Sequence, residues 1–330
     1  VYRSSDALQT QAFNQLVSVR DVKKDFIENY LNTIRDQVLT FSEDKMVVDA
    51  MRDFKQAFKS FRNENSVSDE KIEEMKSALE SYYTDDFSKE YSNRNQGSAA
   101  SVKDKFDQLD NDAIAFQYYY IKDNPNPLGS KEKLDKADDL SEYSKLHGKY
   151  HPIIRNYLGK FGYYDIFLID PDSGNIVYSV FKELDYSTSL KVGPYADTNF
   201  ADAFRRALKA KNTDQFFLED FKSYFPSYED PASFISSPIF EKGTLIGVLI
   251  FQMPMDRINK IMTLRAGLGE TGETYLVGQD KLMRSDSYLD PVHHSVTASF
   301  RNPSKGMVDT EASRAVLDGE TGASIVIDYN

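Results

Sequence analysis

The first sixty residues carry apolar side chains at helical spacing. Between positions 8 and 38 these side chains recur every three or four residues, at Leu8, Ala12, Leu16, Val19, Val22, Phe26, Tyr30, Ile34 and Val38. This periodicity places them on one face and predicts a long amphipathic helix. Ser42 is a suitable N-cap and Asp44 fits a first turn, so a second helix is expected to follow. Its apolar positions are Val47, Met51, Phe54, Phe58 and Phe61.

The apolar face of the first helix has two interpretations. It packs against the chain's own domains, or it forms the interface of a dimer. Further along, the pattern predicts helices over about 69–83 and about 102–122, separated by the polar loop SNRNQGSAAS. The prolines and the glycine of NPNPLGS end the last of these helices. The region 1–114 is therefore expected to be a long N-terminal helical region.

From residue 163 the pattern changes to short apolar runs separated by turns. The segment YYDIFLIDPDSGNIVYS predicts a buried strand over 164–170, a turn at Pro171 and Gly174, and a second strand that runs to about 183. A helix over about 198–211, a strand near QFFLEDF and a hairpin turning at Lys242 and Gly243 follow. This order predicts an antiparallel sheet with helices beside it, which is an α+β module.

A similar unit begins again after the short amphipathic connector DRINKIM. GLGETGETYLVGQDKLMRSDS has the same strand, turn and strand pattern, and GASIVIDY at 322–329 predicts a last strand. The expected fold class is therefore α+β, with a long N-terminal helix followed by two tandem antiparallel-sheet modules. Enzymes seldom need such a tandem, whereas membrane receptors use one module for the ligand and the other to pass strain onward.

Composition excludes several classes of partner. The net charge is 40 minus 52, or −12, without a cluster of Lys and Arg, so no nucleic-acid partner is expected. There is no cysteine, and no apolar run approaches the roughly 18 to 20 residues that span a bilayer. Because the sequence begins at Val1 and stops at Asn330 directly after a strand-like run, we expect a piece of a longer protein. It was excised between two membrane spans, in which case its two ends should lie close together, or it was taken from a cytosolic protein.

Several segments together resemble a known family. YIKDNPNPLGSK, FGYYDIFLIDPDSGNIVYSVFKE, GVLIFQMPMDRIN and above all GLGETGETYLVGQD, after a long N-terminal helix, resemble the double-Cache sensor domains of bacterial chemoreceptors, membrane histidine kinases and cyclases. The resemblance covers nearly the whole chain. It implies PAS-like modules, with a membrane-distal module at 115–260 that binds the ligand and a shorter, incomplete proximal module at 261–330.

The resemblance also implies a function and a location. The chain would be the periplasmic, ligand-sensing part of an inner-membrane receptor, anchored by transmembrane helices outside this sequence and signalling as a homodimer through its long helices. A free-standing extracellular binding or adhesion protein that assembles through its helices is the alternative. Transmembrane segments flanking residues 1 and 330 in the full gene would distinguish the two.

Members of the family that bind amino acids carry an Arg-x-Trp-Tyr motif and an aspartate in the last strand of the distal module. This chain has no tryptophan, keeps only Tyr195 in GPYADTNF, and has Gln252 where the aspartate is expected. A neutral amide cannot form a charge-assisted bond to an ammonium group, so a neutral or acidic small solute is expected in place of an amine. The candidate binding residues are Tyr178, Ser179, Lys182, Tyr186, Tyr195, Tyr224, Ser227, Tyr228, Ser236 and Gln252.

No catalytic, cofactor or metal motif is found. DPDSGN has only part of a calcium loop, and His293 and His294 are adjacent without a third ligand at metal spacing. A nucleophile elbow, a zinc-protease helix and a phosphate loop are all absent from the sequence. We therefore expect a binding domain without enzymatic activity, without a cofactor and without a metal.

Overall fold

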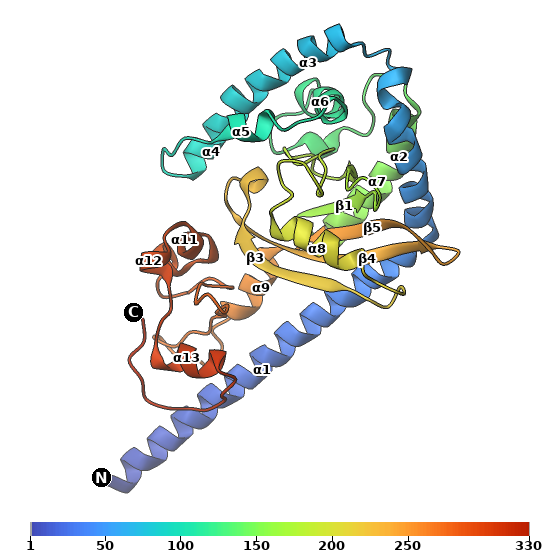
Figure 1. Cartoon of the computed structure of the whole chain (residues 1–330). Helices are drawn as coiled ribbons and strands as arrows, with labels where there is room; N and C mark the ends of the chain where they lie inside the picture. The colour runs from blue at the N-terminus through green and yellow to red at the C-terminus, as the bar shows by residue number, and fades with distance from the viewer. Residues whose placement is uncertain (1, 330) are drawn as a thin grey trace. The chain divides into compact units, whose positions relative to one another are not determined.

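The computed structural model describes residues 2–329, which form two compact units. One unit joins Val1–Ile34 with Pro254–Asn330, and the other is the continuous stretch Arg35–Met253. The long helix α1, Tyr2–Glu43, begins in the first unit and ends in the second (Figure 1). The module boundaries 115–260 and 261–330 stay a prediction. The expected closeness of the two chain ends concerns Val1 and Asn330, which lie outside the described residues.

The long N-terminal helix is confirmed, but its apolar face is buried only in part. Ile34 and Val38 are buried, whereas Leu8, Leu16 and Phe26 are each about half exposed or more. The second helix, α2, spans Lys45–Glu64. Its N-cap is Asp44 and not the expected Ser42, because the Asp44 carboxylate accepts a hydrogen bond from the N–H of Met46 (2.8 Å). Ser42 lies inside α1, where its hydroxyl bonds to the hydroxyl of Ser237.

Short helical segments follow α2 in the second unit. The expected helix over 102–122 is interrupted, because the carboxylate of Asp110 caps a new helix at the N–H of Ala113 (2.7 Å). Two of the segments are π-helical turns, η1 and η2, a conformation that often occurs at functional sites. In order, the segments are α3 Asp69–Ser81, η1 Tyr82–Phe87, α4 Ser88–Arg94, α5 Val102–Phe106, α6 Asn111–Gln117, η2 Tyr118–Lys122, η3 Lys131–Lys133 and α7 Glu142–Phe161.

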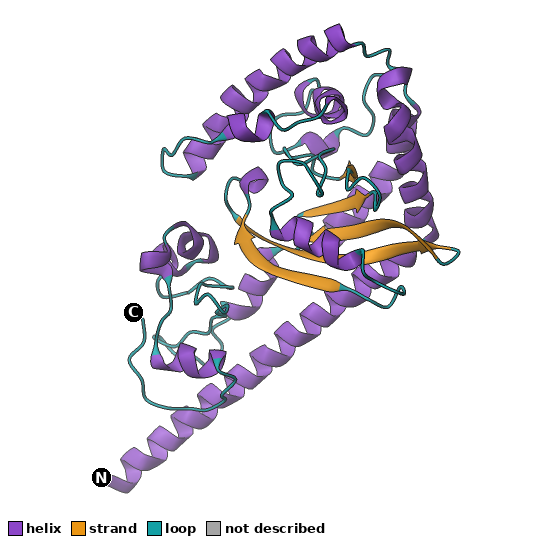
Figure 2. Ribbon diagram, viewed as in Figure 1, coloured by secondary structure: helices purple, strands orange, loops and turns teal. Residues whose placement is uncertain are grey.

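The second unit is built on a five-stranded antiparallel sheet with the order β2-β1-β5-β4-β3 (Figure 2). The strands are β1 Asp165–Ile169, β2 Ile176–Ser179, β3 Phe217–Ser223, β4 Pro231–Glu241 and β5 Thr244–Gln252. The predicted hairpin between β4 and β5 is confirmed, with Lys242 and Gly243 both at positive φ. The expected α+β fold class is therefore observed in this unit.

Helices cover both faces of the sheet. On one face Phe54 of α2 stacks on Tyr178 of β2, with ring centroids 5.1 Å apart. On the other face Phe200 of α8, Asn199–Ala207, packs against Phe167 of β1 (4.5 Å) and Phe234 of β4 (4.6 Å). Successive side chains on a strand alternate between the two faces of the sheet. These ring contacts therefore show which residues of each strand face α2 and which face α8. A short 3₁₀ turn, η4 Phe225–Ser227, leads from β3 into β4.

The first unit is mainly helical where it is described. Its core contains Ile27 of α1 with Ile258 and Met262 of α9, and the buried Lys23 donates from Nζ to the carbonyl oxygens of Met262 and Leu264 (both 2.5 Å). The helices are α9 Met255–Met262, α10 Pro291–His294, α11 Val296–Arg301, α12 Pro303–Gly306 and α13 Glu311–Leu317.

The second copy of the strand pattern forms little sheet. In the described part of 254–330, the strand pairing of the repeat consists of one isolated antiparallel bridge between Val277 and Met283. The expected strand over 322–329 has no strand conformation, and Ile325 and Ile327 are exposed. An apolar alternation forms a strand only beside a partner that accepts its backbone hydrogen bonds, and this segment has none in the described residues. Within residues 2–329, no helix is both long and apolar enough to cross a membrane.

Candidate functional site

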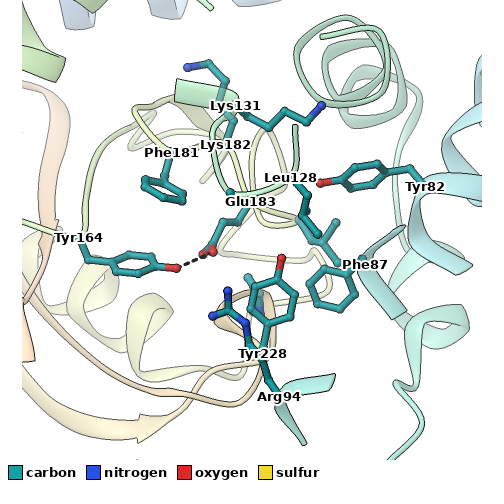
Figure 3. A pocket seen from close by; sticks show the side chains of 13 residues that line it. Tyr82, Phe87, Arg94, Leu128, Lys131, Tyr164, Phe181, Lys182, Glu183 and Tyr228 are labelled. Carbon is teal, nitrogen blue, oxygen red and sulfur yellow. Dashed lines mark hydrogen bonds between the residues drawn. The ribbon is translucent and has the colours of Figure 1, made fainter. Parts of the chain in front are cut away.

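The second unit contains a cavity of about 190 Å³ at the end of the sheet where β1 begins and β2 ends (Figure 3). This volume is below the roughly 300–1,000 Å³ of pockets for drug-sized ligands, so the cavity suits a small solute. Its aromatic lining consists of Tyr82, Phe87, Tyr164, Phe181 and Tyr228. The rest of the lining consists of Arg94, Leu128, Gly129, Lys131, Lys182, Glu183, Leu184 and Pro226.

Asp165, at the start of β1, fixes the position of the segment 180–184, which forms one wall of the cavity. Its buried Oδ1 atom accepts hydrogen bonds from the backbone N–H groups of Val180 (2.9 Å) and Phe181 (3.1 Å), just after β2 ends. Its Oδ2 atom accepts a bond from Ser179 Oγ (2.8 Å), and that hydroxyl oxygen accepts from the N–H of Lys182 (2.9 Å). These bonds hold Lys182 at a φ of 59°, which turns the following residues toward the cavity.

Glu183 is the carboxyl group at the centre of the view in Figure 3. Its two oxygens accept hydrogen bonds from Tyr164 Oη (2.7 Å) and from Ser227 Oγ (3.0 Å). Ser227 in turn accepts a bond from Gln252 Nε2 (3.3 Å), which links the last strand of the sheet to the cavity. Burial, and then the charge of Asp185, raises the pKa of Glu183 well above its usual range, although the Tyr164 and Ser227 bonds act in the opposite direction.

Two further carboxyl groups are buried nearby. Burial raises the pKa of Asp165 to about 7 and the pKa of Asp185 to about 6, and the charge of Asp185 adds to the rise at Asp165. Asp185 Oδ2 accepts a hydrogen bond from Tyr224 Oη (2.6 Å). Three mutually repelling carboxyl groups in one buried region cannot all be ionised at neutral pH without a compensating charge.

Several buried polar atoms in this part of the second unit lack a hydrogen bond. In the described residues they include Asp185 Oδ1, Tyr195 Oη, Ser187 Oγ and Gln252 Oε1. An unsatisfied buried polar group costs about 1–3 kcal/mol, so a polar solute or water that bonded to such atoms would be favoured. Tyr195 lies next to Tyr224, with ring centroids 6.2 Å apart.

The opposite, α2 side of the sheet carries a separate buried cluster. Tyr178 Oη bonds to His151 Nδ1 (2.7 Å), and Tyr186 Oη bonds to Tyr143 Oη (2.8 Å). Lys182 Nζ donates to the carbonyl oxygen of Val180 (3.0 Å), and burial lowers the pKa of Lys182 to about 7. The buried His147 packs against the rings of Tyr120 and Tyr178 in this cluster. The hydroxyl groups of Tyr178 and Tyr186 bond within the cluster, and neither residue lines the cavity.

The structure brings some of the ten predicted site residues together and separates others. Lys182 and Tyr228 line the cavity, and Ser227 and Gln252 form the hydrogen-bonded path to it. Ser179, Tyr195 and Tyr224 lie among the buried carboxyl groups on the α8 side. Tyr178 and Tyr186 belong to the α2-side cluster, and Ser236 donates to the carbonyl oxygen of Ala203 in α8 (2.8 Å). A ligand-binding role for any of them stays a prediction.

The predicted site includes none of the three acids and only Tyr228 of the five aromatic residues that line the cavity. Asp165 interrupts an apolar strand, and Glu183 and Asp185 follow another, so an acidic residue in or beside a buried strand was the available signal. Tyr82 and Phe87 gave no such signal, because they reach the cavity from a helical segment about eighty residues away from β1. Among residues 2–329, no group of three or more His, Asp or Glu side chains is arranged to hold a metal ion.

Comparisons with known proteins give matches only among solved structures. No family model and no curated protein matches this chain. One match is the ligand-binding domain of the Pseudomonas aeruginosa PAO1 amino acid chemoreceptor PctC in complex with GABA, at 15% identity and a TM-score of 0.29 over 45% of this chain and 61% of that one. The chain thus matches about three fifths of the length of that domain.

Two other matches cover more of the chain. The extracellular domain of a protein named as a histidine kinase, vpHK1S-Z8, is 12% identical over 77% of this chain and 83% of that one, with a TM-score of 0.35. The sensory domain of the Campylobacter jejuni chemoreceptor Tlp3 with isoleucine bound is 14% identical over 78% of this chain and 85% of that one, with a TM-score of 0.32. These are the classes of protein that the sequence resembles. Because every TM-score is below 0.5, the function is inferred below from the chain's own residues.

Proposed function

We propose that this chain is the extracytoplasmic sensing domain of a bacterial membrane receptor and that it binds a small solute in the cavity of the second unit. The observation that carries the proposal is the cavity itself. Segments far apart in the sequence, at 82–94, 128–131, 164, 181–184 and 226–228, converge on one small space with an aromatic wall and a hydrogen-bonded carboxyl group. Mostly apolar walls with a few convergent polar groups are typical of sites that bind small molecules.

The cavity is also linked to the long helix by a short path. Tyr164 donates to Glu183 in the cavity, and the preceding residue, Tyr163, donates from its hydroxyl to Gln37 Oε1 of α1 (2.5 Å). Tyr163 packs on Phe251 of β5, which in turn contacts Phe41 of α1. A ligand that moves Tyr164 would therefore act on the helix through a single peptide bond, which supports transmission through α1.

The membrane and dimer parts of the proposal rest on α1 and on the resemblance. We place the chain in the periplasm, between transmembrane segments outside this sequence. Leu8, Leu16, Val22 and Phe26 are exposed apolar residues, and at about 3.6 residues per turn they lie on one side of α1. Two copies that pair along this side would bury these residues, and membrane tethering would raise their effective concentration.

A screen of small metabolites by thermal shift, followed by calorimetry, tests the binding function. A solute that binds in the cavity should raise the melting temperature, and the variant Leu128→Trp should abolish the effect by filling the space from the half-buried rim. Leu140→Trp is the matched control, because Leu140 is exposed and does not line the cavity. A ligand that binds Leu128→Trp and the unchanged chain equally well would refute this location.

A further inference from the structure

The cavity lining combines five aromatic rings with one carboxyl group. Tyr164 stacks with Phe181 (ring centroids 5.1 Å apart) and Phe87 stacks with Tyr228 (4.8 Å), while Tyr82 completes the aromatic lining. The face of an aromatic ring carries partial negative charge and attracts cations within about 6 Å of its centre. The acidic group on this lining, Glu183, adds to the same preference (Figure 3).

Each of the three basic residues of the lining has bonding partners other than Glu183. Arg94 pairs with Glu90 (2.7 Å) and Asp230 (3.8 Å), and its guanidinium lies over the ring of Tyr228. Lys131 Nζ donates to the backbone carbonyl oxygens of Asn124 (2.9 Å) and Asn126 (2.6 Å), and it lies 5.8 Å from the centre of the Tyr82 ring.

Lys182 is engaged in the same way. Its Nζ donates to the carbonyl oxygen of Val180 and lies 6.0 Å from the ring centres of Tyr120 and Tyr178, on the α2 side. In Figure 3 the ammonium groups of both lysines point away from the carboxyl group of Glu183. None of these cations forms an ion pair with Glu183 in the described structure.

From this lining we infer that the cavity binds a small organic cation, whose ammonium group contacts the aromatic rings and pairs with the carboxylate of Glu183. The inference rests on the proposed function of the cavity as a ligand site, and it names the chemistry of the ligand. It reverses the expectation drawn from Gln252, which was a neutral or acidic solute. Gln252 reaches the site only through Ser227, whereas Glu183 lines the cavity directly.

Cation binding should be coupled to the release of a proton. Burial and the charges of Asp185 and Asp165 raise the pKa of Glu183, so the empty site favours the neutral acid. A bound cation stabilises the carboxylate, so affinity should rise with pH until Glu183 is ionised without the ligand. The titratable and charged groups around Glu183, from the elements packed on it, are Tyr82, Arg94, Lys131, Tyr164, Asp165, Lys182, Asp185, Tyr195, Tyr224 and Tyr228.

Three probes of matched shape separate charge from size. Choline carries the cation, 3,3-dimethylbutan-1-ol is its neutral isostere, and 3,3-dimethylbutanoate is an anion of similar bulk. Calorimetry should show that choline binds at least about tenfold more tightly than the alcohol, since a charge-assisted contact contributes more than a neutral one. Choline titrations in buffers of different ionisation enthalpy should also show proton release.

Two pairs of variants test the residues. Glu183→Gln should weaken choline binding by about tenfold to a hundredfold and leave the alcohol nearly unchanged, because the amide keeps hydrogen-bonding capacity and removes the charge. Glu142→Gln, at an exposed acid of α7, is the control for charge alone. Tyr82→Leu should weaken choline binding several-fold, whereas Tyr82→Phe retains the ring and should retain the affinity. Circular dichroism of each variant confirms that it is folded.

Each result bears on the inference. The inference is supported if choline binds more tightly than the other two probes and Glu183→Gln weakens its binding. Equal or tighter binding of the alcohol or the anion, or choline binding that is indifferent to Glu183→Gln, overturns the cation assignment while the proposed sensing function stands. If none of the three probes binds, the cation assignment is also wrong, and the metabolite screen with Leu128→Trp then decides separately whether the cavity binds any solute.

Discussion

Replacing Asp165 by asparagine should change how the stability of the second unit depends on pH. Asp165 Oδ1 accepts hydrogen bonds from the N–H groups of Ile166 (2.6 Å), Val180 (2.9 Å) and Phe181 (3.1 Å). The oxygen of an asparagine side chain can accept the same three bonds, so the local structure should survive. The carboxyl group differs because burial, and then the charge of Asp185, raises its pKa from 3.8 to about 7.

The sign and size of the effect follow from this pKa. The folded chain holds the Asp165 proton more tightly than the unfolded chain, so the stabilisation is complete below about pH 4 and is lost as the pH rises toward 7. The gap between 3.8 and about 7, at about 1.4 kcal/mol per pH unit, limits the loss in unfolding free energy to about 4 kcal/mol. Asparagine has no proton to lose, so the stability of the variant should decline less over this range.

Urea unfolding followed by far-ultraviolet circular dichroism at about pH 4.5, 6 and 7.5 measures the difference. Asp172→Asn is the matched control, because Asp172 lies in the turn after β1 with a side chain that is 78% exposed, and its variant should follow the pH profile of the unchanged chain. If the profiles of Asp165→Asn and the unchanged chain were parallel from acid to neutral pH, the assignment of a raised pKa to Asp165 would be wrong.

Three further predictions concern the turn, the site and the assembly. In thermal unfolding, Gly174→Ala should destabilise the second unit by about 1–3 kcal/mol, because φ is 78° and a Cβ would lie 2.8 Å from Cγ of Lys191. Gly243→Ala should destabilise it less in the same assay, because φ is 79° but a Cβ would have nothing within 4 Å. Gln252→Ala should weaken an identified ligand by no more than about tenfold in calorimetry and leave the fold intact, because Gln252 reaches the cavity only through its bond to Ser227, and unchanged affinity would remove Gln252 from the site. Replacing both Leu16 and Phe26 by serine should abolish concentration-dependent self-association in sedimentation, and a strictly monomeric unchanged chain would contradict the dimer proposal.

Local patterns predicted the elements that depend on local interactions. The hairpin at Lys242 and Gly243 was predicted because a tight turn needs residues that accept positive φ, and both have it. The long helix α1 followed from apolar spacing alone. The break before α6 was not predicted, because the apolar spacing continues through 102–122. Its N-cap, Asp110, is the signal in the sequence that marks the break.

The candidate site was less predictable because its residues meet only in the tertiary structure. Alternation along β1 and β2 does separate Tyr178 from Ser179, which point to opposite faces, yet both were included in one site. Glu183 is hard to predict as a site residue because an acid after a strand usually faces solvent. Tyr82 and Phe87, which line the same cavity as Glu183, belong to a turn of π-helix from another part of the chain.

The origin of the cavity lining has a consequence for how such a domain could diversify. Tyr82, Phe87 and Tyr228 come from irregular turns outside the sheet, whereas Tyr163 and Tyr164 hold the path toward α1. If the cavity binds a solute as proposed, mutations in the turns would alter which solute fits without disturbing strand register or the bond to Gln37. Gene duplicates could then acquire new ligand preferences over a few substitutions while the path from Tyr164 to α1 stays the same.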